Sequence, residues 1–391
     1  MAKGLFFCLP SVSVSRTLTP VLQEAAKSGI DIIYYNTNDF KPAGEYDFRF
    51  KPYPANFKGY YSDKIDGGTS YFDFGNILID SAETLLDFLA QEIEIEKPDV
   101  IIHSHLAVWG KLIARFAQKP AVTLYTTFVL DKRIMFSFQR EHIPVNGSKT
   151  AHVSDALRFH RKYTGLYKKL SLAGQPDLWD VYINKGTLNL SFILPSFQPQ
   201  RSLFGKEYQY LGYPTFSEKG DLQKRLIYVS MGTIMNKDIL FFSLIIHVLK
   251  ELQTESIIAV GNEISIDQFG EMPPHIKIIG FADQRAILKE AKLFITRGGM
   301  ASVHEAVYSR TPMIAVPLIP EQQITAVTIE ELGIGLRLSP AAINEEVLYN
   351  AIKEVLNNGR YIKNLEELAR EIPVTSPEKL ATDLIKDLLY D

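Results

Sequence analysis

The chain has 391 residues, of which 46% are hydrophobic and 22% charged, so it is long enough to bury two ordinary cores and two α/β domains are expected. Its formal net charge is −3 and no segment carries a basic run, which disfavours a nucleic acid as partner. Cys8 is the single cysteine, which excludes an intramolecular disulfide framework and a cysteine-based metal cluster.

The first part of the chain alternates predicted strands with predicted helices, as expected for a parallel sheet. Buried strands are predicted at 4–10, 31–36, 98–104 and 120–125, and amphipathic helices at 19–29 and 108–118. The apolar start is too short to cross a membrane, and the polar residues after it fit a loop better than a cleaved signal. We therefore expect a cytoplasmic protein without a membrane span.

A polar and aromatic stretch with helical patches lies between about 130 and 190. We expect its aromatic side chains to pack helices on the sheet. They are Phe136, Phe138, Tyr163, Tyr167 and Trp179.

Residues 210–225 combine Gly212-Tyr213-Pro214 with a charged segment and are interpreted as an interdomain linker. Five strand-like segments separated by helix-like ones follow it, which predicts a doubly wound parallel sheet with a ligand at the carboxyl ends of its strands. These segments are 225–232, 256–262, 275–281, 291–299 and 311–318.

The most informative block is 294–322, which reads as strand, Gly-Gly turn, helix, strand and polar loop. Gly298 and Gly299 allow a sharp turn and a close approach of the backbone to a ligand, and Ser302 lies in the first turn of the helix. Unpaired backbone N–H groups and the positive end of the helix dipole then point above the turn, where a diphosphate fits.

This block resembles the donor-binding signature of the family-1 glycosyltransferases, particularly the bacterial macrolide type. Their pattern is approximately His-Gly-Gly, Ser, Glu, a proline-containing strand and Asp-Gln. The matching positions here are Arg297-Gly298-Gly299, Ser302, Glu305, Pro312, Pro317 and Glu321-Gln322. Residues 227–233 also resemble the first donor-domain strand and its phosphate-facing loop, with Ser230, Gly232 and Thr233 in place.

Residues 278–288 resemble the segment that binds the base of the nucleotide. The resemblance implies that Phe281 stacks on the uracil and that the backbone of Ala282 pairs with it. An ordinary core position for Phe281 is an equally good interpretation. In the same way, Glu305 would bind the ribose hydroxyls, and Glu321-Gln322 the sugar hydroxyls.

The resemblance implies a GT-B fold, in which two doubly wound Rossmann-like α/β domains face each other across a cleft. Residues 1–212 would form the acceptor-binding domain, residues 213–375 the nucleotide-sugar-binding domain, and residues 376–391 a helix that returns to the first domain. The implied reaction is inverting transfer of a hexose from a UDP- or TDP-sugar to a hydroxyl of an apolar natural product of polyketide or macrolide type. The nucleotide sugar is a co-substrate, no other cofactor is expected, and both a monomer and a homodimer fit the sequence.

The residues that should activate the acceptor depart from the family pattern. Inverting members carry Gly-His-x-x-Pro-x-Leu after the first strand, where the histidine takes the acceptor proton, and Thr17 stands at that position here. An alignment anchored on Trp109-Gly110 puts Ser104 in place of the aspartate that orients the histidine. Because a threonine hydroxyl cannot act as a base near neutral pH, the loss of both groups suggests a coordinated change of function.

Two histidines, His103 and His105, flank Ser104, and all three are candidate catalytic residues together with Thr17. One hypothesis is that His105 has taken over as base, since its usual pKa suits the task. The alternative, which we favour, is that it lines or caps the loop. No metal site is expected, because the two histidines have no third ligand nearby in the sequence.

Arg297 replaces the histidine of the donor signature and has two interpretations. Its guanidinium can bind the diphosphate through bidentate hydrogen bonds. Alternatively, it fills an emptied donor site and pairs with Glu305 or Glu321. Glu321 is one methylene longer than the usual aspartate.

A second function remains open, namely a repurposed GT-B protein without sugar transfer. It would catalyse another step on a natural product, such as dehydration or cyclisation, or act as an auxiliary partner. A dinucleotide oxidoreductase fits poorly, because LPSVSVS rather than G-x-G-x-x-G follows the first strand.

Overall fold

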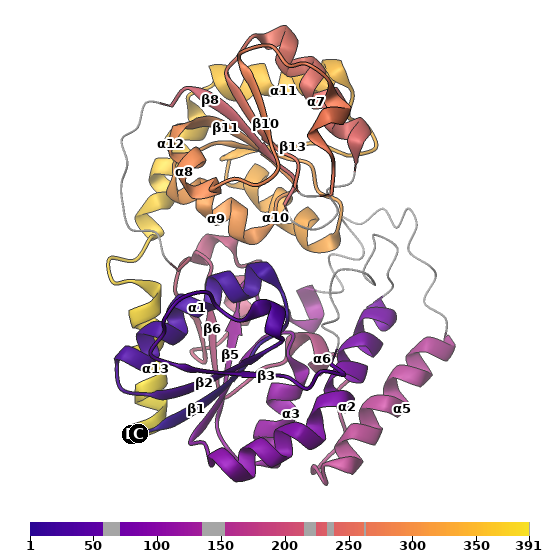
Figure 1. Ribbon diagram of the computed structural model, residues 1–391, viewed down its shortest axis with the longest axis vertical. Coiled ribbons are helices and arrows are strands. Elements are labelled where there is room, and N and C mark those ends of the chain that lie inside the picture. Colours follow the sequence, from indigo (N-terminus) through magenta and orange to yellow (C-terminus); the bar gives the residue numbers. More distant parts are fainter. Residues whose placement is uncertain (58–70, 135–152, 215–223, 233–237, 262, 391) are drawn as a thin grey trace. The chain divides into compact units, whose positions relative to one another are not determined.

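The computed structural model describes residues 1–57, 71–134, 153–214, 224–232, 238–261 and 263–390, and its chain forms two compact units (Figure 1). The first unit contains the elements up to β7 together with the C-terminal helix α13, and the second contains β8 through α12. Each unit is built around one parallel sheet, so the predicted pair of doubly wound sheets is confirmed.

The first unit holds a seven-stranded sheet in the order β3-β2-β1-β4-β5-β6-β7, with every pair parallel. Its central strands are continuous apolar runs because helices bury both faces. The strands are β1 (Lys3–Phe7), β2 (Asp31–Asn36), β3 (Arg49–Pro52), β4 (Val100–Ser104), β5 (Ala121–Tyr125), β6 (Leu188–Ser191) and β7 (Tyr208–Tyr210).

Helices cover this sheet on both faces (Figure 1). The helices α1 (Val12–Lys27) and α13 (Pro377–Tyr390) pack side by side on one face. On the other face lie α2 (Tyr71–Glu96), α3 (Val108–Phe116), α5 (Val153–Lys169) and α6 (Asp180–Ile183). Tyr163 and Tyr167 are buried in that second layer, as expected for packing aromatics, whereas Phe136 and Phe138 lie outside the described residues.

The second unit holds a six-stranded parallel sheet in the order β10-β9-β8-β11-β12-β13. Its strands are β8 (Leu226–Ser230), β9 (Ser256–Ala259), β10 (Ile276–Ile279), β11 (Ala291–Thr296), β12 (Met313–Ala315) and β13 (Gly335–Arg337). Its helices are α7 (Ile239–Leu252), α8 (Gln284–Glu290), α9 (Met300–Tyr308), α10 (Pro320–Glu331), α11 (Glu345–Asn357) and α12 (Arg360–Leu368). Short 3₁₀ turns occur at Asn38–Phe40, Pro195–Phe197, Arg201–Leu203, Ile266–Phe269 and Ala369–Glu371.

Three sequence predictions need correction. The first helix begins at Val12, not near residue 19, and Pro20 lies inside it. Short strands at 49–52, 188–191, 208–210 and 335–337, all but the second at a sheet edge, were not predicted, because three or four residues are too few to show a periodic pattern. The interpretation of 210–225 as a linker does not hold at Tyr213, which belongs to the first unit and has a buried ring.

The order of strands creates one topological switch point in each sheet. In the first, the chain runs from β1 outward through β2 to β3 and then returns to β4 on the other side of β1. In the second, the equivalent neighbours are β8 and β11. In doubly wound sheets, ligands bind outside the carboxyl ends of such strand pairs. Among the described residues, no helix combines the length and the apolar character needed to cross a membrane.

Candidate donor and catalytic sites

The switch point of the second sheet brings several predicted donor residues together. Ser230 ends β8 directly beside Thr296, the last residue of β11. Gly232 follows with a φ of +80° and is exposed, and its positive φ favours glycine. Thr233 lies outside the described residues, so its expected place at the phosphates stays a prediction.

The Gly-Gly turn after β11 has the geometry that the sequence predicted. Gly298 has a φ of +85°, and a Cβ there would lie 3.5 Å from the backbone oxygen of Gln322. Gly299 is the N-cap of α9, has open space around it and makes no side-chain cap hydrogen bond. Because the first amides of a helix have no intrahelical partners, the start of α9 offers uncapped donors to an anion.

Arg297 lies buried beside this helix start, with 3% of its surface exposed. Its Nη1 donates to the carbonyl of Val316 at 3.3 Å, its guanidinium lies 4.4 Å from the centre of the Phe241 ring, and its Nη2 is 3.9 Å from Oδ2 of Asp238. Its Nε and Nη2 are buried and have no hydrogen-bond partner among the described residues. The alternative in which Arg297 pairs with Glu305 or Glu321 is not seen among the described residues, where Asp238 is the carboxylate that faces the guanidinium.

Burial lowers the pKa of Arg297 to about 10, a shift that Asp238 partly opposes, so the guanidinium is still charged at neutral pH. A buried cation with two unpaired N–H donors is unfavourable unless a counter-charge is nearby. The site is therefore suited to accept an anion. Asp238 and Phe241 were not predicted as site residues, because only the fold brings the start of α7 beside β11.

Ser302 and Glu305 are linked by one side chain from α8. Nε2 of Gln284 donates to Ser302 Oγ at 3.0 Å and to Glu305 Oε2 at 2.6 Å. On the other side, Nε of Arg285 donates to Glu305 Oε1 at 3.0 Å. Glu305 is 1% exposed, so these two donors fix a buried carboxylate in one orientation. Gln284 and Arg285 were missed as site residues, although both fall in the segment 278–288, which was predicted to bind the base.

Phe281 follows β10 and is 69% exposed, which excludes the core interpretation. An aromatic ring open to solvent at the carboxyl end of a strand is available for stacking on a flat ligand. Ala282 beside it is half-buried.

Gln322 stabilises the start of α10 through its own side chain. Its Oε1 accepts from the amides of Leu318 at 2.8 Å and Ile319 at 3.3 Å, as a residue at the third helical position does in a capping box. Only its Nε2 group is left for a sugar hydroxyl. Glu321 is half-buried in the first turn of the same helix.

In the first unit, the two residues at the expected dyad positions form internal hydrogen bonds. Thr17 is 2% exposed; its hydroxyl donates to the carbonyl of Ser13 at 2.8 Å and lies 3.3 Å from the hydroxyl of Tyr213. Oγ of Ser104 accepts from the amide of Leu9 at 2.8 Å and joins the ends of β4 and β1. Both hydroxyls therefore stabilise the fold of the switch point.

His103 is fully buried on β4. Its Nδ1 lies 3.1 Å from the carbonyl of Ser104 and its Nε2 3.3 Å from Oγ1 of Thr123. A Cβ on Gly110 would lie 2.4 Å from the His103 Cβ, so this glycine permits the close approach of α3 to β4. Burial lowers the pKa of His103 to about 3, and its contacts are those of a structural histidine.

His105 lies just beyond β4 and is 8% exposed. Its ring stacks on Tyr125 with 5.5 Å between centroids, and its Nδ1 has no hydrogen-bond partner in the described part of the chain. Burial lowers its pKa to about 4. These features weaken the relocated-base hypothesis, because no carboxylate among the described residues orients the ring and an imidazole with so low a pKa is a weak proton acceptor.

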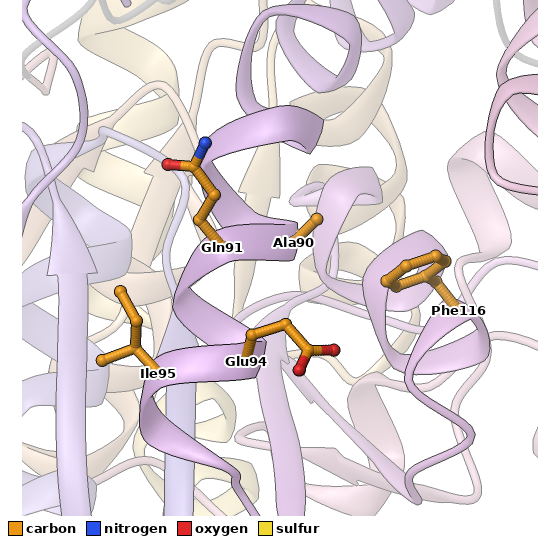
Figure 2. Close-up of a pocket in the computed structure, with 5 residues that line it drawn as sticks. All are labelled: Ala90, Gln91, Glu94, Ile95 and Phe116. Carbon is orange, nitrogen blue, oxygen red and sulfur yellow. The ribbon is translucent and has the colours of Figure 1, made fainter.

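A separate apolar depression with a volume of about 460 Å³ lies on the outer surface of α2 and α3 (Figure 2). It is lined by Ala90, Gln91, Glu94, Ile95 and Phe116. These residues belong to the C-terminal parts of both helices, at the edge of the sheet opposite the carboxyl ends of the strands. Within the described ranges, no group of three or more His, Cys, Asp or Glu residues is arranged to hold a metal ion.

Comparisons with known proteins agree with this geometry. Residues 272–377, which include most of the donor residues, match the family model for UDP-glucoronosyl and UDP-glucosyl transferases. The UDP-glucosyltransferase YojK of Bacillus subtilis (strain 168) is 26% identical over 401 positions, covering 98% of this chain and 97% of that protein. Demethyllactenocin mycarosyltransferase of Streptomyces fradiae is 24% identical and covers 100% of this chain and 87% of that protein.

Among solved structures, the glycotransferase of kitacinnamycin superposes with a TM-score of 0.83 at 20% identity, over 99% of each chain. This similarity shows that the two chains share the GT-B fold. The family model, the full-length relatives and the shared fold all lead to the same assignment. The chain is thus similar over its full length to family-1 glycosyltransferases of the macrolide type and has their GT-B fold, and these relatives together with the family model indicate a glycosyltransferase that uses a nucleotide sugar.

Proposed function

We propose that the protein transfers a hexose, with inversion, from a UDP- or TDP-sugar to a hydroxyl of an apolar natural product. The observation that carries the proposal is the buried Arg297 beside the uncapped start of α9, whose Nε and Nη2 have no hydrogen-bond partner in the part of the chain that the structure describes. A diphosphate satisfies both groups, because its oxygens accept from the guanidinium and from the helix amides.

The other donor residues have roles consistent with this placement. Phe281 stacks on the base, with the backbone of Ala282 pairing beside it. The carboxylate of Glu305, held by Gln284 and Arg285, receives the ribose hydroxyls. Glu321 and the free amide group of Gln322 bind the sugar. Charge that develops on the leaving diphosphate during transfer is stabilised by Arg297 and the start of α9.

The test is calorimetric titration of the full chain with UDP, TDP and their glucose conjugates. Arg297→Gln should weaken nucleoside diphosphate binding by roughly 1.5–3 kcal/mol, the size of a charge-assisted hydrogen bond. Arg225→Gln is a matched control, because this exposed arginine pairs with Glu255 and Glu290 at the amino end of β8, away from the switch point. Unchanged affinity in Arg297→Gln would remove Arg297 from the donor site.

A second function, a reaction on a natural product without sugar transfer, is favoured by one observation. Thr17 and Ser104, which stand where the family places its acceptor-activating dyad, are committed to internal hydrogen bonds. Failure of every nucleotide to bind a folded protein would favour this second function. Binding together with release of the hexose from the donor would favour the first.

A further inference from the structure

We propose that Asp238 is the resident counter-ion of Arg297 and competes with the diphosphate for it, so that this carboxylate promotes release of the spent nucleotide. The proposal rests on the proposed function, because it takes Arg297 as the residue that binds the diphosphate. Asp238 thereby becomes a positioning residue of the donor site.

The start of α7 places two side chains, those of Asp238 and Phe241, beside Arg297. Asp238 is the N-cap of this helix, and its Oδ1 accepts from the amide of Phe241 at 3.0 Å. The ring of Phe241 supports one face of the Arg297 guanidinium, with 4.4 Å to the ring centre. The cap thus fixes Oδ1 of Asp238, while Oδ2 faces Arg297.

The contact between the two charges is loose enough to be exchanged. Nη2 of Arg297 and Oδ2 of Asp238 are 3.9 Å apart, beyond hydrogen-bond distance, and no described residue accepts a hydrogen bond from Nη2. The Arg297 side chain is 3% exposed and that of Asp238 50% exposed. Asp238 therefore offsets part of the unfavourable burial of the guanidinium while leaving its donors available.

A diphosphate that takes these donors places a second anion beside Asp238. The two anions repel each other, and the repulsion grows with the charge of the ligand. A nucleoside diphosphate ends in a free phosphate and carries more negative charge than the nucleotide sugar. Asp238 therefore opposes binding of the product more than binding of the donor. This difference helps the site to empty after transfer, a step that often limits turnover in enzymes.

Asp238→Asn isolates the charge, because asparagine caps helices about as well as aspartate. We expect roughly three- to tenfold tighter binding of UDP or TDP, whichever the protein takes, with a smaller gain for the nucleotide sugar. The gain should shrink at high salt. Product inhibition should become stronger, and without ligand the melting temperature should fall slightly, because the buried guanidinium loses part of its counter-charge. Glu367→Gln, an exposed charge change on α12 of the same unit, should leave binding unaltered.

Equal or weaker binding by a stably folded Asp238→Asn protein would show that Asp238 only caps α7, and would overturn the proposal. Inorganic pyrophosphate, titrated in parallel, separates this result from failure of the proposed function. If neither UDP nor TDP binds but pyrophosphate binds more tightly to the variant, the counter-ion role stands and nucleotide-sugar transfer falls. If none of the three ligands binds either protein, both are overturned.

Discussion

At the scale of single residues, exposure decides between two interpretations that the sequence left equal. Phe281 is 69% exposed after β10, whereas Phe294, an aromatic residue of the neighbouring block, is fully buried on β11. Phe281→Ala should therefore leave the melting temperature unchanged but weaken nucleotide binding by about 1–3 kcal/mol, the value of one base-aromatic stacking contact. Calorimetry with the preferred nucleoside diphosphate measures the loss.

Phe281→Tyr is the matched control, because it keeps the aromatic face and should bind nearly as tightly as the parent. If alanine and tyrosine at this position gave the same affinity as phenylalanine, the ring would have no part in binding the base. The exposure could not have been predicted, because an apolar residue at a strand end has the same local pattern in either environment.

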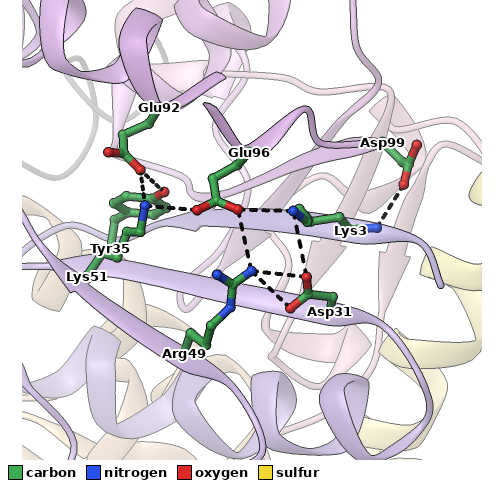
Figure 3. A network of polar contacts seen from close by, with 8 residues as sticks. All are labelled: Lys3, Asp31, Tyr35, Arg49, Lys51, Glu92, Glu96 and Asp99. Atoms are coloured by element: carbon green, nitrogen blue, oxygen red, sulfur yellow. Dashed lines mark hydrogen bonds and ion pairs between the residues drawn. The ribbon is translucent and has the colours of Figure 1, made fainter. Parts of the chain in front are cut away.

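At the scale of elements, an ion network joins the amino ends of β1, β2 and β3 to the end of α2 (Figure 3). Glu96 contacts Lys3 at 3.0 Å, Lys51 at 2.9 Å and Arg49 at 3.4 Å. Burial alone would raise the pKa of Glu96, but hydrogen bonds from Lys51 and Lys3 and the charge of Arg49 lower it to about 2.

The lowered pKa of Glu96 predicts how the first unit responds to acid. The unfolded chain binds the proton near pH 4.3 and the folded chain only near pH 2, so the stabilisation is complete above pH 4.3 and is lost as pH falls towards 2. Glu96→Gln should lower the free energy of unfolding by roughly 2–3 kcal/mol at neutral pH, and by progressively less in acid. Urea unfolding at neutral and acidic pH measures the difference.

Glu94→Gln provides the control on the same helix, because Glu94 is exposed and lies outside the network. Its substitution should change the free energy of unfolding by less than about 0.5 kcal/mol. If the free energy of unfolding fell by the same amount in acid for Glu96→Gln and for the parent, the ion pairs of Glu96 with the three neighbouring cations would not contribute to stability. The network was not predicted, since its members are brought together only by strand order.

At the scale of the whole molecule, the two switch points belong to different compact units. Substitutions in the first should therefore leave nucleotide affinity unchanged within about 0.5 kcal/mol. For His105→Ala we expect this unchanged affinity and less than about a tenfold fall in kcat, because burial lowers the pKa of the ring to about 4 and no carboxylate orients it among the described residues. Steady-state kinetics with a phenolic test acceptor, together with calorimetry, give both values.

A fall in kcat of a hundredfold or more, with unchanged nucleotide affinity, would instead identify His105 as the base, since loss of a general base usually has effects of that size. Arg297→Gln is the counterpart in the second unit and should lower both nucleotide affinity and turnover. Tyr125→Phe keeps the aromatic contact with His105 and should have the kcat and nucleotide affinity of the parent, although it loses the hydrogen bond that the Tyr125 hydroxyl donates to the carbonyl of Ile183.

The sequence by itself determined the class of the fold, the helix at 300–308 and the glycine turn before it. Continuous apolar strands, helical periodicity and the need for a positive φ are local properties of the chain. The resemblance to a family signature added the prediction of which residues bind the donor. The local pattern predicted a wrong helix start at Thr19-Pro20, two residues that commonly begin a helix. The helix α1 instead extends back to Val12, because residues before Thr19 are buried.

Only the tertiary structure decided what surrounds each of these residues. It placed Asp238 rather than Glu305 opposite Arg297. It also joined Glu305 to Gln284 and Arg285 by hydrogen bonds. His105 is buried there without a carboxylate partner in the described part of the chain. These contacts join segments separated by 20 to 59 positions, or depend on the burial of a side chain by several elements at once. The packing of the sheets and helices sets both, and no local pattern in the sequence encodes them.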